Sequence, residues 1–71
     1  MKYNNGDRFI LHSTNGLDYD IYLVNVNEYR PPGKEYGIDV YLNGNPVYQD
    51  VVFVDELFLD ECEIVKEEEY D

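Results

Sequence analysis

The sequence predicts a mostly β domain, in which five short antiparallel strands form a small barrel and a short helical turn precedes the last strand. The chain has 71 residues, which is enough for one domain. Apolar residues make up 44% of it and aromatic residues 15%, more than disordered acidic chains contain. Two Asn-Gly dipeptides, at residues 15–16 and 43–44, separate runs rich in Val, Ile, Leu and Tyr, which is typical of β-hairpins.

Four of the strands follow from these runs, and we expect them at residues 7–12, 19–26, 36–42 and 47–54. Strict alternation would place Tyr22, Val24 and Val26 on one face of the second strand. The two Asn-Gly dipeptides connect the first strand to the second and the third to the fourth. A loop at residues 29–34 separates the second strand from the third, because its paired prolines cannot donate to a strand ladder. The pattern therefore describes an antiparallel meander.

The segment after residue 54 has two interpretations. Apolar residues at helical spacing favour one helix through residue 65, whereas Phe58, Cys62 and Ile64 also fit one face of a strand. Asp55 suits a helix N-cap, but the Glu run at residues 67–69 would lie at the unfavourable end of a long helix. We therefore expect a short helical turn at residues 55–59 and a fifth strand at residues 61–66. The domain then covers residues 1–66, and residues 67–71 form a frayed acidic tail.

Short motifs spread over most of the chain resemble a known fold family. They are Gly6-Asp7-Arg8-Phe9, Tyr22-x-Val24 and Val54-Asp55-Glu56-x-x-Leu59. The pattern is similar to small SH3-like barrels of phage and mobile-element proteins, in which Gly-Asp-x-Φ opens the first strand and an acidic helical turn precedes the last. The resemblance implies a five-stranded SH3-like barrel and no activity. The chain has no Trp, so a proline-binding groove of the SH3 type is not expected.

Charge is the strongest functional signal in the sequence. The formal net charge is −11, and it is uneven: residues 1–45 hold six acids against four bases, whereas residues 46–71 hold ten acids against Lys66 alone. Direct binding of nucleic acid or of an anionic membrane depends on Lys and Arg, so both are poor partners. A basic protein is the natural partner of such a surface. Acidity that serves only solubility remains the alternative.

Catalytic and metal sites are not expected. His12 is the sole histidine, and Ser13 beside it points to the other face of a strand, so a nucleophilic site is unsupported. Cys62, the single cysteine, can form neither an internal disulfide nor a zinc cluster, and we interpret it as a core residue in a cytoplasmic protein. Neither a calcium-loop pattern nor a phosphate-binding glycine loop is present, so we expect no cofactor or metal.

The chain contains eight tyrosines, and those that face outward from strands would offer contact area beside the carboxylates. Cross-strand pairs that only stabilise the sheet are the alternative. The carboxylates at positions 55, 56 and 60 are expected to point to solvent. The predicted partner-binding residues are Asp50, Asp55, Glu56, Asp60, Glu61, Glu63, Tyr41 and Tyr48.

Two function classes follow from this surface. In the first, the chain is a DNA-mimic-like inhibitor that occupies the nucleic-acid channel of a host protein, and it resembles anti-restriction and anti-CRISPR proteins in size, acidity and absence of motifs. In the second, it is an accessory protein-protein interaction module of a phage or mobile element, without mimicry. Both are non-enzymatic, and both predict a monomer or small homo-oligomer in the cytoplasm of the host cell. Salt dependence separates them, because electrostatic binding weakens steeply with ionic strength.

Overall fold

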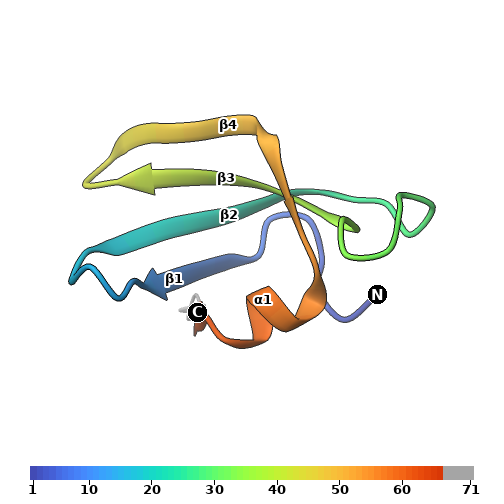
Figure 1. Ribbon diagram of the computed structural model, residues 1–71, viewed down its shortest axis with the longest axis horizontal. Coiled ribbons are helices and arrows are strands. Elements are labelled where there is room, and N and C mark those ends of the chain that lie inside the picture. The colour runs from blue at the N-terminus through green and yellow to red at the C-terminus, as the bar shows by residue number, and fades with distance from the viewer. Residues whose placement is uncertain (67–71) are drawn as a thin grey trace, which may run out of the picture.

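Five antiparallel strands form one sheet in the computed structural model, which describes residues 1–66 (Figure 1). The sheet has the order β4-β3-β2-β1-β5, and a short helix precedes its last strand. The predicted mostly β architecture is therefore confirmed. Its two edge strands, β4 and β5, are not paired with each other within residues 1–66, so closure into a barrel is not observed there. The elements are β1 (Arg8–His12), β2 (Asp18–Val26), β3 (Tyr36–Leu42), β4 (Asn45–Val54), α1 (Glu56–Asp60) and β5 (Glu63–Val65).

The two Asn-Gly hairpins form where the sequence predicts them. Asn43 and Gly44 both have positive φ, 52° and 82°, the conformation that a two-residue turn between twisted strands requires. In the β1–β2 connection, Gly16 has φ 86° and donates its N–H to the carbonyl of Ser13. These turns set the register of both hairpins, so that His12 lies opposite Asp18 and Leu42 opposite Asn45.

Irregularities in the sheet change some of the expected positions. The register of β2 against β3 shifts between Leu23 and Asn25, which is the effect of a β-bulge. Strict alternation across Val24 is therefore wrong, and Val26 packs against the core instead of sharing the face of Tyr22. β4 begins at Asn45, two residues earlier than expected, because Pro46 is tolerated in an edge strand.

The ambiguous segment forms a helix and then a strand, as expected, with shifted bounds. Asp55 is the N-cap of α1, and its side chain accepts a hydrogen bond from the backbone N–H of Phe58 at 2.9 Å. Glu61 is the C-cap, so the helix includes Asp60 and β5 begins only at Glu63, two residues later than predicted. The predicted tail at residues 67–71 lies outside the described residues.

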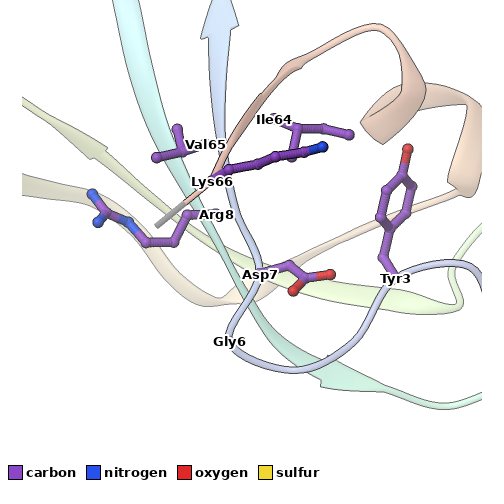
Figure 2. Close-up of a pocket in the computed structure, with 7 residues that line it drawn as sticks. All are labelled: Tyr3, Gly6, Asp7, Arg8, Ile64, Val65 and Lys66. Atoms are coloured by element: carbon purple, nitrogen blue, oxygen red, sulfur yellow. The ribbon is translucent and has the colours of Figure 1, made fainter. Parts of the chain in front are cut away.

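The segment before β1 is held by backbone hydrogen bonds to β2. Gly6 donates its N–H to the carbonyl of Leu23 at 2.8 Å, and Leu23 donates in turn to the carbonyl of Asp7. The Asp7 side chain accepts from the N–H of Asn4, which closes the turn. Figure 2 shows this turn beside β5, with Tyr3 on one side of the intervening hollow and Arg8 on the other. The Gly-Asp motif therefore builds the entry to β1.

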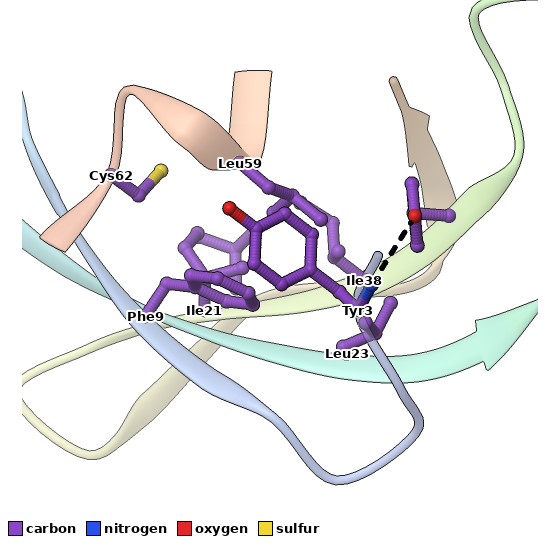
Figure 3. Close-up of a cluster of buried hydrophobic side chains, with 9 residues drawn as sticks. Tyr3, Phe9, Ile21, Leu23, Ile38, Leu59 and Cys62 are labelled. Atoms are coloured by element: carbon purple, nitrogen blue, oxygen red, sulfur yellow. Dashed lines mark hydrogen bonds between the residues drawn. The ribbon is translucent and has the colours of Figure 1, made fainter. Parts of the chain in front are cut away.

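The core lies between the inner face of the sheet, α1 and the N-terminal segment (Figure 3). Leu59 of α1 is fully buried, and Tyr3 makes edge-on ring contacts with Phe9 and Tyr36 at centroid distances of 5.1 and 6.0 Å. The backbone N–H of Tyr3 also donates to the Tyr36 hydroxyl, the dashed line in Figure 3. The expectation that Cys62 is a core residue is confirmed. The buried residues are Tyr3, Phe9, Ile21, Leu23, Tyr36, Ile38, Val40, Leu59 and Cys62.

Candidate protein-binding surface

Acidic side chains from two distant segments meet at one hollow of about 430 Å³, which we call the acidic hollow. Glu28 and Glu35 come from the loop before β3, and Asp55 and Glu56 come from the start of α1. Among residues 1–66, no Lys or Arg lines this hollow. Asp55 and Glu56 were predicted as binding residues from the sequence, whereas Glu28 and Glu35 were not. The loop acids carry no local signal, because only the pairing of β3 with β4 brings the loop beside the helix.

Two of these four carboxylates have structural roles. Asp55 is half-buried as the N-cap of α1, so the expectation that it points freely to solvent is wrong. Both carboxylate oxygens of Glu35 accept from the N–H of Gly33 at 3.1 Å. Glu28 and Glu56 are exposed, and their side chains form no hydrogen bond or ion pair within residues 1–66. These two residues are therefore the ones available to a partner.

Asp60 lies at the end of α1 and is held by the N-terminal segment. Its Oδ1 accepts from Lys2 Nζ at 2.8 Å and from the Tyr3 hydroxyl at 2.5 Å. The Lys2 ammonium, followed by the Tyr3 hydroxyl, lowers the pKa of Asp60 below its ordinary value. The carboxylate in turn raises the pKa of both Lys2 and Tyr3. Although exposed, Asp60 thus connects the chain start to the helix.

Glu63 is engaged by the only histidine. His12 Nε2 lies 2.8 Å from Glu63 Oε1 on β5, and His12 Nδ1 lies 2.8 Å from Asp18 Oδ1 on β2. Both partners are acceptors when ionised, so only the imidazolium can donate to the two of them at once. Glu63 and then Asp18 raise the pKa of His12 above its ordinary value. His12 is an exposed residue of β1, and its ring joins three neighbouring strands.

Asp50 and Tyr41 lie on the outer face of the sheet, where β3 and β4 meet. Asp50 has φ 60° at an irregular point of β4, and its N–H donates to Asp39 Oδ1. Tyr41 makes an edge-on contact with Tyr22 at 5.3 Å. This pair is the cross-strand arrangement that the sequence analysis kept as an alternative to a binding role, and its rings are half-buried. Asp39 was missed, although its alternation with Val40 signalled an outward side chain.

Tyr48 belongs to a different surface, an apolar groove of about 280 Å³ on the inner face of the sheet. Figure 1 shows α1 toward the end of the sheet away from the hairpin turns. The groove is lined by residues of β1, β2, β3 and β4 together with Phe58 of α1. Tyr48 is 54% exposed and Val47 beside it is 41% exposed. We call this surface the inner groove. It is lined by Leu11, Tyr19, Ile21, Ile38, Val40, Val47, Tyr48, Val52, Val54 and Phe58.

The predicted binding residues are therefore divided among several places. Asp55 and Glu56 share the acidic hollow, Asp50 and Tyr41 lie on the outer face, and Tyr48 lines the inner groove. β4 and β5 are opposite edges of the sheet, which separates Asp50 from Glu63. Glu61 is exposed at the C-cap of α1, and its side chain has no hydrogen bond or ion pair within residues 1–66.

The remaining reactive groups form no recognisable catalytic or metal centre in the described part of the chain. The Cys62 thiol donates to the carbonyl of Phe58, and burial, followed by the charge of Glu61, raises its pKa. The thiol therefore stays protonated and is a poor nucleophile. Residues 1–66 contain no group of three or more side chains placed to hold a metal ion.

No helix among residues 1–66 has the length and apolar character that crossing a membrane requires. Comparison with known protein families, curated proteins and solved structures gave no match to this chain.

Proposed function

We propose that this chain is a non-enzymatic acidic protein that binds and blocks a basic protein handling nucleic acid, in the manner of DNA-mimic inhibitors of the anti-restriction or anti-CRISPR type. The proposal includes a phage or mobile-element origin and a location in the host cytoplasm. The observation that carries it is the imbalance of charge, a net −11 on 71 residues. A surface of this charge attracts basic proteins and repels nucleic acid.

The internal contacts of three of the five bases support this proposal. Lys2 is paired with Asp60, the Arg8 guanidinium lies 4.9 Å from the ring centre of Tyr22, and Arg30 lies 4.6 Å from that of Phe53. These bases serve the fold, and no Lys or Arg of residues 1–66 lines the acidic hollow. Each carboxylate that meets a Lys or Arg of a partner at a partly desolvated interface contributes on the order of 1–3 kcal/mol.

Capture of partners from a bacterial lysate at low and then high salt, followed by a binding titration of the captured protein, tests this function. We expect a nucleic-acid-handling protein whose affinity falls steeply with salt, and nucleic acid should compete for it. The Glu28→Lys/Glu56→Lys variant should weaken binding by more than about tenfold, because both side chains belong to the acidic hollow and have no structural partner. Failure of nucleic acid to compete would refute the inhibitor proposal.

The control compares two single charge reversals, Glu56→Lys in the acidic hollow and Asp20→Lys outside it, which alter the net charge equally. Equal losses in both variants would mean that overall charge, and not the hollow, determines affinity.

A plain interaction module is the second candidate, and the exposed apolar residues of β4 favour it. Val47, Tyr48, Val51 and Phe53 are all at least 41% exposed. A partner anchored on these side chains would bind with weak salt dependence and would not be displaced by nucleic acid.

A further inference from the structure

The edge strand β4 is only partly protected against strand addition, because Pro46 and the irregularity at Asp50 leave Val47 and Val51 exposed. β4 has β3 as its sole strand neighbour within residues 1–66, so one side of its backbone is not used by the sheet. Natural edge strands are commonly protected by Lys side chains or by short length. β4 spans 10 residues, contains no Lys, and has Asp50 as its single charged side chain. Its exposed apolar side chains include Val51, which is 65% exposed.

The inner groove extends this edge. Val47, Tyr48, Val52 and Val54 of β4 line it on one side, and Leu11 is among the residues that line it from the rest of the inner face. A strand added to β4 would place alternate side chains toward the inner and outer faces of the sheet. Those on the inner side would meet the apolar groove. Those on the outer side would pass beside the carboxylates of β3 and β4.

The charge of β2, β3 and β4 indicates what kind of segment would add to the β4 edge. β2, β3 and β4 contain four acids and no base, and two of the acids, Asp39 and Asp50, lie next to each other across the β3–β4 pair. Arg30 lines a hollow beside Asp50, but its guanidinium is already engaged with the side chain of Asn25 and the ring of Phe53. A second copy of the chain would bring two molecules of net charge −11 together. A strand with cationic side chains on its outer face would instead complement these carboxylates.

We propose that β4 and the inner groove bind an extended segment of the partner in which apolar residues alternate with Lys or Arg, added to the sheet as a sixth strand. The inference rests on the proposed function only in that the partner is basic. Main-chain hydrogen bonds to β4 supply affinity, the groove takes the apolar side chains, and Asp39 and Asp50 attract the basic ones.

The test uses a synthetic peptide of about eight residues with alternating Val and Lys, the usual strand length or slightly more. We expect it to bind with slowed hydrogen exchange at the backbone amides of β4. Two further peptides carry N-methyl groups on the odd or on the even residues. Because a strand is added through one of its edges only, one methylated peptide should lose binding by more than about tenfold while the other binds like the parent. Equal binding by both would overturn strand addition.

Variants of the protein test the site itself. Val47→Lys/Val51→Lys places two cations on the β4 edge and should weaken the peptide by about tenfold or more. The control, Leu57→Lys/Ile64→Lys, makes the same change at exposed residues of α1 and β5 and should alter affinity less than about threefold. Thermal unfolding checks that each variant folds, and the methylated peptides require no variant. Parallel losses in both variants would overturn the assignment to β4.

The outcomes separate this inference from the proposed function. A captured basic protein that binds parent and Val47→Lys/Val51→Lys equally, together with a peptide that does not bind, would refute strand addition and leave the inhibitor function standing. Peptide binding at β4 without nucleic-acid competition for the captured partner would refute the inhibitor function alone. Dimerisation of the chain that is abolished by Val47→Lys/Val51→Lys would show that a second copy occupies the edge, and would overturn the inference.

Discussion

Asp55 has a structural role and a proposed binding role, and two substitutions separate them. Its carboxylate caps α1 through the 2.9 Å hydrogen bond from the Phe58 N–H, and it also lines the acidic hollow. Asp55→Ala removes both the cap and the charge. Asp55→Asn removes the charge alone, because an amide oxygen is as good an N-cap acceptor as a carboxylate.

The expected magnitude follows from the position of α1. Loss of an N-cap costs about 0.5–2 kcal/mol. The helix has five residues and carries the buried Leu59, so fraying of its first turn would reach the core. We therefore expect Asp55→Ala to lower the free energy of unfolding by about 1–2 kcal/mol and Asp55→Asn by a few tenths. In a domain of this size, each kcal/mol corresponds to a shift in Tm of about 4–8 °C.

Urea unfolding followed by circular dichroism gives the stability of both variants, and titration of the captured partner gives their affinity. If Asp55 also binds the partner as an anion, the two variants should lose equal affinity while differing in stability. Equal stability of Asp55→Ala and Asp55→Asn would refute the capping argument. Unchanged affinity in both would remove Asp55 from the binding surface and leave it a purely structural residue.

Three further predictions concern stability. The pKa of His12 is raised, so the stability that its ion pairs contribute is complete below the ordinary value of 6.5 and is lost as the pH rises through the folded value. The urea midpoint should therefore fall as the pH rises above 6.5, and His12→Gln should abolish this fall. The pKa of Asp60 is lowered, so its contribution to the free energy of unfolding is present above pH 3.8 and is lost as the pH falls below that value. The stability of the Asp60→Asn variant should therefore depend less on acid pH than that of the parent. Leu59→Ala should lower the free energy of unfolding by about 2–5 kcal/mol, whereas Leu57→Ala, at a site that is 71% exposed, should change it by less than about 0.5 kcal/mol. Similar urea midpoints for the two leucine variants would contradict the burial of Leu59.

Local signals were sufficient to predict the strands and their hairpins. The Asn43-Gly44 dipeptide needs positive φ at both positions, and this requirement alone sets a tight turn between β3 and β4. Alternation then identified the buried faces, as at Ile38 and Val40, because a half-buried strand exposes every second residue. The bulge near Val24 was not predictable in this way, since it depends on how β2 fits β3 and leaves no composition signal.

The candidate site was predicted less well, because the sequence does not show which acidic residues have partners within the fold. Lys2 and Asp60 are 58 positions apart in the sequence, and His12 and Glu63 are 51 positions apart. No local sequence pattern can therefore predict either contact. Both depend on the placement of α1 and β5 against the N-terminal half of the chain. Glu28 was not predicted as a binding residue for the same reason, since only the folded loop brings it to the acidic hollow.

Carboxylates that already have a partner within the protein should contribute less to binding than carboxylates that have none. A base on a partner that approaches Asp60 or Glu63 must compete with Lys2 or His12, so part of the new contact only replaces an old one. A base that approaches Glu56 or Glu61 displaces only water. The acidic residues between positions 55 and 63 therefore do not act as one uniform binding surface. Asp60 and Glu63 join α1 and β5 to the N-terminal part of the chain. Glu56 and Glu61 keep their charge for an external cation, which agrees with a fold that places three of its five bases in internal contacts.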